Sequence, residues 1–208
     1  MTLMADCVFC DYEPKERVLA TSKSFYAMPA LGQISNGGHV IIAPKAHYTC
    51  LGEMSEKELD ELDRFMHKLK AKMRMLYGPL ASFEQGVYGQ TINHAHLQIV
   101  PVPADIELLP LLQRSFPNKR QLHDITELIT VHRQFGPYMF YHPQNMLMHA
   151  FLPVTPLPDQ YLRKLVSQAL GKQKRGDWRQ WRASKTAAAL DDIFIEKTVE
   201  DLSELLKD

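Results

Sequence analysis

The sequence predicts an α+β fold in which a long helix packs on an antiparallel sheet and a mainly helical C-terminal part follows. Residues 93–103 alternate between polar and apolar side chains, as a half-buried strand does. Residues 55–77 instead repeat apolar side chains at helical spacing. After residue 103 the periodicity weakens and helix-prone segments predominate. We therefore predict a first domain over residues 1–104 and a C-terminal extension, residues 105–208, packed on it.

The composition is that of an ordinary globular protein. The chain has 208 residues, of which 45% are hydrophobic and 23% charged, and its 24 Lys and Arg balance its 24 Asp and Glu. No overall field therefore attracts nucleic acid or an acidic membrane, so any anion selectivity must be local. No apolar run approaches the ~20 residues of a membrane span. Residues 1–6 do not resemble the start of a signal peptide, and the three cysteines are too few for a disulfide framework, so we expect a cytoplasmic location.

Cys7 and Cys10 form a Cys-x-x-Cys pair near the start of the sequence. Such a pair offers two thiolates from one tight turn, which suits a tetrahedral metal ion or a redox couple. A thioredoxin-like role needs a strand before the pair and a long helix after it, but only six residues precede Cys7. Metal binding is the favoured function, and thiols retained without a metal are the alternative.

Two short strands at residues 18–22 and 24–28 are expected next, before a loop of turn-forming residues. Residues 39–44 contain a continuous apolar run after His39, which predicts a buried central strand. His47 follows it, as a third metal ligand or a polar loop residue. The long helix begins at Ser55 with a Ser-x-x-Glu capping box. Its apolar stripe comprises Leu59, Leu62, Phe65, Met66, Leu69, Met73 and Leu76.

A further strand that ends at Glu84 and a flexible turn lead into the alternating segment. On that segment His94, His96 and Gln98 share one face. Glu84 would lie near this face, where it either orients an imidazole or simply ends its strand. One explanation is purely structural, namely a half-buried strand with hydrogen-bonded histidines. Two imidazoles and a carboxamide at alternate positions instead favour a chemical role for this face.

The second half of the chain predicts mainly helices. A basic stretch, residues 172–185, carries Trp178 and Trp181 among its cations. Cations with aromatic neighbours can hold phosphates or stack bases, whereas the structural alternative is a cationic surface helix packed through its tryptophans. The other expected elements are helix-prone segments at residues 105–116 and 119–128, strands at 138–141 and 146–152, a helix at 158–170 and a closing helix or helix pair at 187–207.

Three motifs stand in one order along the chain: Cys7-x-x-Cys10, the segment from His39 to His47, and His94-x-His96-x-Gln98. Together they resemble the histidine triad (HIT) superfamily of nucleotide hydrolases and transferases. The glutamine at the third triad position resembles the branch of galactose-1-phosphate uridylyltransferases and dinucleoside polyphosphate phosphorylases. The layout is also similar to CwfJ-type C-terminal domains of splicing-associated proteins. The resemblance covers roughly the first half of the chain and implies a HIT-like domain over residues 1–104.

The resemblance implies roles for individual residues. By position, the ligands of a structural zinc ion would be Cys7, Cys10, His47 and His94. Two thiolates and two imidazoles suit a closed tetrahedral site. The family nucleophile falls on His96, with Gln98 as the second catalytic residue. The family's ribose-binding position, which is acidic or Asn, falls on Tyr26, which is a departure from the pattern.

The implied reaction is attack by His96 on the α-phosphorus of a nucleotide, which forms a phosphoramidate. The imidazole must be neutral at the attacking nitrogen and oriented through the other one. Gln98 would donate to a non-bridging phosphate oxygen and is a poor proton donor, which favours phosphate-like leaving groups. The further substrate-binding candidates are His39, Lys45 and the backbone near Gly86 and Gly89, with His142 and His149 as candidates from the second half.

Two alternatives remain open. The chain could be a non-catalytic or RNA-associated binding module that keeps a HIT-like fold and a zinc site. His94 and His96 could instead both ligate one catalytic metal, as His-x-His pairs on strands do. The expected partner is a nucleotide or a nucleotide derivative, and no membrane association is expected. Binding of nucleic acid and formation of a homodimer remain open.

Overall fold

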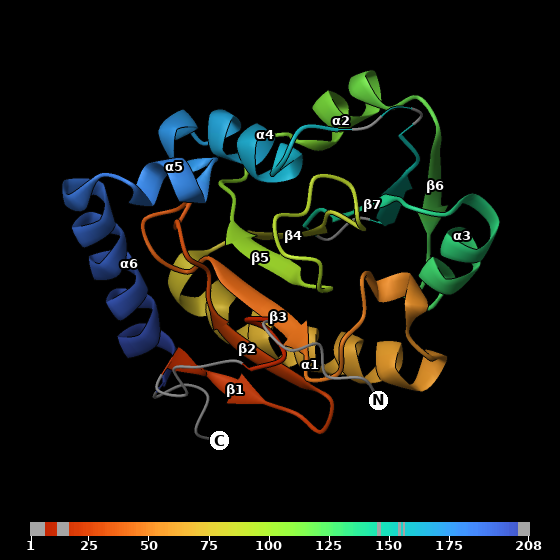
Figure 1. Ribbon diagram of the computed structural model, residues 1–208, viewed down its shortest axis with the longest axis horizontal. Coiled ribbons are helices and arrows are strands. Elements are labelled where there is room, and N and C mark those ends of the chain that lie inside the picture. The colour runs from red at the N-terminus through yellow and green to blue at the C-terminus, as the bar shows by residue number, and fades with distance from the viewer. Residues whose placement is uncertain (1–6, 12–16, 145–146, 154, 156, 204–208) are drawn as a thin grey trace.

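The computed structural model describes residues 7–11, 17–144, 147–153, 155 and 157–203. Its centre is an eight-stranded sheet in the order β1-β2-β3-β5-β4-β7-β8-β6, and every neighbouring pair is antiparallel (Figure 1). The predicted antiparallel α+β class is confirmed. The strands are β1 (Ala20–Thr21), β2 (Phe25–Pro29), β3 (Val40–Pro44), β4 (Leu80–Glu84), β5 (Leu97–Pro101), β6 (Lys119–Leu122), β7 (Met139–His142) and β8 (Met148–Phe151). The helices are α1 (Glu56–Tyr77), α2 (Leu109–Ser115), α3 (Glu127–Phe135), α4 (Tyr161–Ala169), α5 (Trp178–Arg182) and α6 (Lys185–Ser203), with 3₁₀ turns η2 (Leu51–Glu53) and η3 (Gln173–Arg175).

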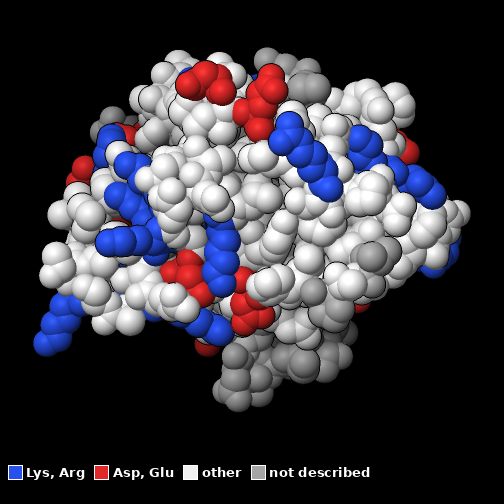
Figure 2. All heavy atoms as spheres, turned by 90° about the horizontal axis from the view of Figure 1, so that it is seen from above, with Lys and Arg blue, Asp and Glu red and all other residues white. Residues whose placement is uncertain are grey.

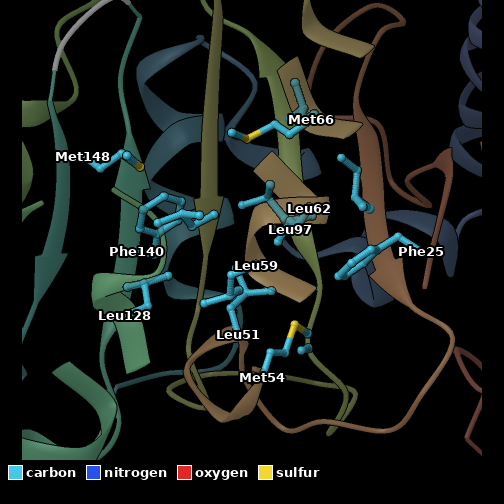
Figure 3. Close-up of a cluster of buried hydrophobic side chains, with 14 of the residues drawn as sticks. Phe25, Leu51, Met54, Leu59, Leu62, Met66, Leu97, Leu128, Phe140 and Met148 are labelled. Atoms are coloured by element: carbon cyan, nitrogen blue, oxygen red, sulfur yellow. The ribbon is translucent and has the colours of Figure 1, made fainter. Parts of the chain in front are cut away.

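Helix α1 covers one face of the sheet, as predicted. The expected capping box fixes its start, because the Ser55 hydroxyl accepts from the Glu58 N–H and the Glu58 carboxylate accepts from the Ser55 N–H. Its buried stripe meets the strands in a core that includes Leu59, Leu62 and Leu97 (Figure 3). Removing this apolar area from water is the main force that holds the helix on the sheet.

Strand β5 is buried on both faces, whereas the sequence predicted one apolar and one polar face. Leu97 and Ile99 belong to the core under α1. Val100 points the other way, into a second core that it shares with Leu162 of α4. Gln98 is therefore the polar residue that the strand keeps on the α4 side, and it is 1% exposed.

The predicted strand at residues 93–103 is too long at both ends. β5 begins at Leu97 and ends at Pro101. The preceding N–H, of Ala95, donates to the Tyr48 carbonyl 2.7 Å away, outside the sheet ladder. His94 and His96 thus lie in a bend, where their rings are free of the strict alternation of a strand.

The second half of the chain completes the sheet. β7 pairs with β4 through residues such as Tyr141 and Phe83, and β8 and β6 continue outward. The strands predicted at residues 138–141 and 146–152 are present, although Met146 lies outside the described residues. Strands from before and after residue 104 therefore share one sheet, and the domain boundary at residue 104 remains a prediction.

The helix predicted at residues 119–128 is wrong. Lys119–Leu122 forms the edge strand β6, paired with β8, and helix α3 begins at Glu127. The pattern of this segment is mainly polar, which suits an edge strand with one neighbour and carries little periodicity. Pairing with β8, and not local propensity, decides its conformation.

The C-terminal helices hold the loop between β2 and β3. The buried Asp191 carboxylate of α6 accepts from the N–H groups of Gly32 and Gln33, at 2.9 and 2.6 Å. Gly32 has φ +67°, and a Cβ there would clash with the Trp178 side chain, so this position requires glycine. Helix α6 is the closing helix predicted at residues 187–207, of which 204–207 lie outside the described part. No helix of the described residues is long and apolar enough to cross a membrane.

Candidate functional site

Four potential metal ligands converge where the Cys-x-x-Cys turn meets the end of β3 and the bend before β5. The ligand atoms of Cys7, Cys10, His47 and His94 all lie within 4.8 Å of one another. Cys7 Sγ and Cys10 Sγ lie 3.4 and 3.6 Å from His94 Nδ1, and Cys10 Sγ lies 3.4 Å from His47 Nδ1. Tetrahedral zinc, with bonds of about 2.3 Å to sulfur and about 2.0 Å to nitrogen, separates such atoms by about 3.5 Å. The four side chains therefore fit a metal ion.

His94 is oriented for this role through its second nitrogen. Its Nε2 donates to the Pro44 carbonyl oxygen at 2.9 Å, which leaves Nδ1 unprotonated on the side of the thiols. Burial lowers the pKa of His94 to about 4. The ring is therefore neutral near pH 7, as a metal ligand must be.

His96, two residues later, presents the other nitrogen. Its Nδ1 donates to the His94 carbonyl oxygen at 2.8 Å, so the lone pair is on Nε2. Burial lowers the pKa of His96 and keeps the ring neutral. Among the described residues the ligand cluster includes His94 but not His96, so one metal shared by both rings has no support in this geometry.

His96 and Gln98 line a cavity of about 370 Å³. Phe9, from the Cys-x-x-Cys turn, forms one wall, and its ring centroid lies 5.6 Å from that of His94 and 5.2 Å from that of His96. The described residues that line the cavity include three arginines and no aspartate or glutamate. These arginines are Arg17, Arg163 and Arg179, and the apolar walls include Val8, Met28, Leu31, Ile41, Ile92 and Trp178.

Two donors converge on the side-chain oxygen of Gln98. His39 Nε2 and Arg163 Nη1 each lie 3.1 Å from Oε1. Burial holds the pKa of His39 well below its usual range, so this ring is neutral and donates from Nε2. With its oxygen occupied, Gln98 has its amide N–H groups left to donate toward the cavity.

The other residues predicted to contact substrate are placed differently. His39 is fully buried behind Gln98. Lys45 donates from Nζ to the Ser22 carbonyl oxygen at 2.6 Å. Gly86 and Gly89 lie in the turn after β4 with positive φ, packed against neighbouring backbone. None of these four is among the described residues that line the cavity.

Three further titratable candidates lie away from the cavity. Glu84 does not orient an imidazole, because its Oε1 accepts from the Leu51 N–H at 2.8 Å. Burial raises the pKa of Glu84 to about 8. His142 and His149 are on β7 and β8 and are not among the described cavity residues. Tyr26, on which the resemblance places the family's ribose-binding position, donates from its hydroxyl to the Phe9 carbonyl oxygen at 2.9 Å and so supports the cavity wall.

The sequence did not reveal how the C-terminal half contributes to the cavity. Arg163 of α4 and both Trp178 and Arg179 of α5 line it. Gln160 fixes this corner, because its Oε1 accepts from the Trp178 N–H at 3.0 Å. The basic stretch with its tryptophans was a signal for α5. Arg163 lies before that stretch, and no local pattern distinguishes it from a surface arginine.

The antiparallel sheet, the ligand cluster and the His-x-His-x-Gln segment define a histidine triad-like protein. Residues 1–116, more than half of the chain, match the family described as "Protein similar to CwfJ C-terminal". The chain belongs to this family, and the resemblance to CwfJ-type domains is confirmed.

Relatives support the same assignment. Human "CWF19-like protein 1" is 27% identical over 195 residues, which cover 86% of this chain and 35% of that protein. "Zinc finger CCCH domain-containing protein 64" of Arabidopsis thaliana is 23% identical over 201 residues, 88% of this chain and 33% of that protein. "Uncharacterized HIT-like protein MG132" of Mycoplasma genitalium is 26% identical over 103 residues, 47% of this chain and 73% of that protein. The chain thus spans about a third of the length of the first two relatives.

Solved structures of HIT proteins overlap the chain in part. A HIT family protein from Bacillus subtilis has a TM-score of 0.43 and 19% identity, covering 49% of this chain and 76% of that one. A hypothetical histidine triad nucleotide-binding protein from Sulfolobus tokodaii has a TM-score of 0.41 and 18% identity, covering 82% and 97%. At these scores the fold description rests on this chain's own sheet.

Proposed function

We propose that this protein binds a nucleotide and cleaves or transfers it at the α-phosphate through a covalent intermediate on His96, as a nucleotide hydrolase or nucleotidyltransferase. The observation that carries the proposal is the His96 ring, which donates from Nδ1 to the His94 carbonyl 2.8 Å away and lines the cavity. This hydrogen bond selects the tautomer whose Nε2 lone pair can attack phosphorus.

In the first step, His96 Nε2 bonds to the α-phosphorus while the bond from phosphorus to the leaving oxygen breaks. The electron pair of that bond leaves with a phosphate-type group. The His94 carbonyl stabilises the positive charge that develops on the ring, and the Gln98 amide donates to a non-bridging oxygen. In the second step, water or a phosphate acceptor attacks phosphorus and releases His96.

The identity of the third triad residue limits the leaving group. A histidine could protonate a basic leaving group, whereas the carboxamide of Gln98 does not titrate near neutrality. The leaving group must therefore depart as a stable anion. This supports phosphoanhydride substrates over substrates with amine or alkoxide leaving groups.

The metal in this proposal is a structural zinc ion held by Cys7, Cys10, His47 and His94. Four protein ligands leave no open position for substrate, which is the arrangement of a structural site. Such a site would fix the turn that carries Phe9 and thereby one wall of the cavity.

The proposal also assigns roles to the other residues predicted to bind substrate. Gln98 contacts the substrate directly, and His39 supports Gln98 through its Nε2 hydrogen bond. Phosphate contacts from Lys45, Gly86 and Gly89 remain predictions. So do the cytoplasmic location and the homodimer.

Trapping of the intermediate tests the proposal. The full chain would be incubated with nucleoside triphosphates and dinucleoside polyphosphates labelled at the α-phosphate, and then denatured in alkali, where the P–N bond of a nucleotidyl-histidine survives. Wild-type protein should retain label and His96→Ala should not. His67→Ala, at an exposed position of α1, is the matched control and should label normally. Label that persists in His96→Ala, or no label from any substrate, would refute the covalent mechanism.

A non-catalytic, RNA-associated module is the second candidate. The basic stretch favours it, since Lys174, Arg179 and Lys185 are all exposed. In Figure 2, Lys and Arg gather on the side of α5 and α6, with acidic side chains between them. Arg182, for example, is paired with Asp191 and Asp192.

Titration with single-stranded RNA at several salt concentrations tests this candidate. A binding module should bind RNA with a steep salt dependence and trap no label on His96. Label on His96 without RNA affinity would favour the enzyme.

A further inference from the structure

The guanidinium of Arg163 is a buried charge that the C-terminal half brings to the cavity. Its side chain is 4% exposed, and it comes from α4 to line the cavity beside Gln98. Its hydrogen-bond acceptors among the described residues are all neutral: Gln98 Oε1 at 3.1 Å and the carbonyl oxygens of Leu31 and Gly32 at 3.4 and 2.5 Å. Arg163 Nε is buried with no hydrogen-bond partner among the described residues.

The nearest carboxylates are occupied by other groups. Asp191 accepts from the loop N–H groups of Gly32 and Gln33 and pairs with Arg182. Asp177 pairs with Lys164 and accepts from the Gln180 N–H at the start of α5. These two acids act on Arg163 only over a longer range, although burial lowers the Arg163 pKa only to about 10. The side chain is therefore a cation at neutral pH, buried without a counter-ion.

A buried, unpaired charge is costly unless a ligand completes its surroundings. The guanidinium lies beside the Gln98 amide and lines the same cavity as His96, and none of the described residues lining it is acidic. We infer that Arg163 binds a phosphate oxygen of the substrate, and that with the Gln98 amide it forms the site for a nucleoside 5′-phosphate. This inference rests on the proposed function, since it takes the cavity as the nucleotide site.

The other cavity residues fit the rest of such a ligand. Arg17 and Arg179 lie nearer solvent and can meet further phosphate oxygens. The Trp178 ring, with Arg179 5.4 Å from its centroid, offers a flat apolar wall of the kind that holds a base. The C-terminal half therefore supplies cationic and aromatic groups to a site whose nucleophile comes from the first half.

Equilibrium binding tests this inference separately from catalysis. Adenosine, guanosine, cytidine and uridine 5′-monophosphates and their matching nucleosides would be titrated calorimetrically into the full chain and its variants. Wild-type protein should bind at least one monophosphate about 10- to 100-fold more tightly than its nucleoside, because charge-assisted hydrogen bonds are strong in a buried site. Arg163→Met should lose that preference and bind both ligands alike.

Two variants protect the result from a folding artefact. Arg163→Lys keeps the charge without the planar fork and should restore part of the preference, whereas a residue needed only to hold Gly32 would give no such charge dependence. Lys174→Met removes an exposed cation of the same half of the chain, outside the described cavity lining, and should change nothing. Unfolding temperatures of all variants would accompany the titrations.

The inference is overturned if folded Arg163→Met keeps the full phosphate preference, or if wild-type protein never distinguishes monophosphate from nucleoside. Labelling of His96 reads a different property. A phosphate preference that depends on Arg163 without any label would sustain this inference and refute the covalent reaction. Label on His96 with no effect of Arg163→Met on phosphate binding would do the reverse.

Discussion

The metal-ligand cluster and the cavity contain imidazoles only two residues apart, yet their surroundings differ in one decisive respect. Both rings are buried and neutral, and both donate to a backbone carbonyl. His94 donates from Nε2 to Pro44, whereas His96 donates from Nδ1 to His94. His94 therefore turns Nδ1 to two thiols, and His96 keeps its Nε2 lone pair for the cavity.

The two rings therefore differ because of their backbone hydrogen-bond acceptors and not because of their burial. Burial alone would make both rings equivalent bases. The position of one carbonyl oxygen beside each ring selects the tautomer, and the neighbouring groups then determine its use. The thiols suit His94 to the proposed role of metal ligand, and the cavity, whose described lining has no acidic residue, suits His96 to the proposed role of nucleophile.

The largest expected effect comes from removing the ring that faces the cavity. His96→Ala should lower nucleotide turnover by on the order of 10³-fold or more, because it removes the nucleophile. Its zinc content should equal that of wild-type protein, since His96 is not in the described ligand cluster. Turnover assays and metal analysis on the same preparation check both statements. Loss of zinc from this variant would break the proposed division.

The second effect addresses the cluster. Cys10→Ser should release the zinc and lower the free energy of unfolding by about 3 kcal/mol or more, because structural zinc binding contributes directly to folding. Metal analysis and urea unfolding provide the measurement. His67→Ala removes an exposed imidazole outside both potential ligand groups and is the control, with zinc and stability expected to remain. If Cys10→Ser kept both its metal and its stability, the cluster would not be a structural metal site.

The third effect concerns the side chain that joins the two regions. Phe9 contacts both rings, so Phe9→Ala should destabilise the protein by about 2 kcal/mol and raise the KM for nucleotide several-fold. Thermal unfolding and steady-state kinetics would show both changes. Met75→Ala, at a side chain of α1 that is 75% exposed and outside the described cavity lining, should behave like wild-type protein. A change in KM without any change in stability would mean that Phe9 serves the cavity alone.

The smallest expected effect on nucleotide turnover comes from a buried acid that belongs to neither region and instead affects stability. The folded-state pKa of Glu84 is raised from 4.5 to about 8, so the folded protein holds a proton that the unfolded chain loses. Stability should therefore fall as pH rises from about 4.5 to about 8, by up to about 1.4 kcal/mol per pH unit. Glu84→Gln should flatten this decline, as urea unfolding at pH 5 and pH 8 would reveal. An equally steep decline in the variant would show that Glu84 ionises normally in the folded state.

Much of the fold follows from local patterns in the sequence. The capping box and apolar stripe of α1, the buried strand β3 and the strands β7 and β8 are each encoded within a few residues. The polar segment of β6 is not, because its strand conformation depends on pairing with β8. The predicted alternation of β5 also failed at its start, since Ala95 bonds to Tyr48 and bends the chain before Leu97.

The sequence by itself selected the residues to which we assign the proposed chemistry of the first half: two thiols, His47, His94, His96 and Gln98, each in a spacing that a turn or strand makes meaningful. Only the tertiary structure brought Arg163 to within 3.1 Å of Gln98, across 65 residues of sequence, and turned the two imidazoles to different partners. The physical reason is the distance along the chain over which each effect operates. Spacing and residue type determine local structure over a few residues, whereas the partner of a buried charge depends on how distant apolar surfaces pack together.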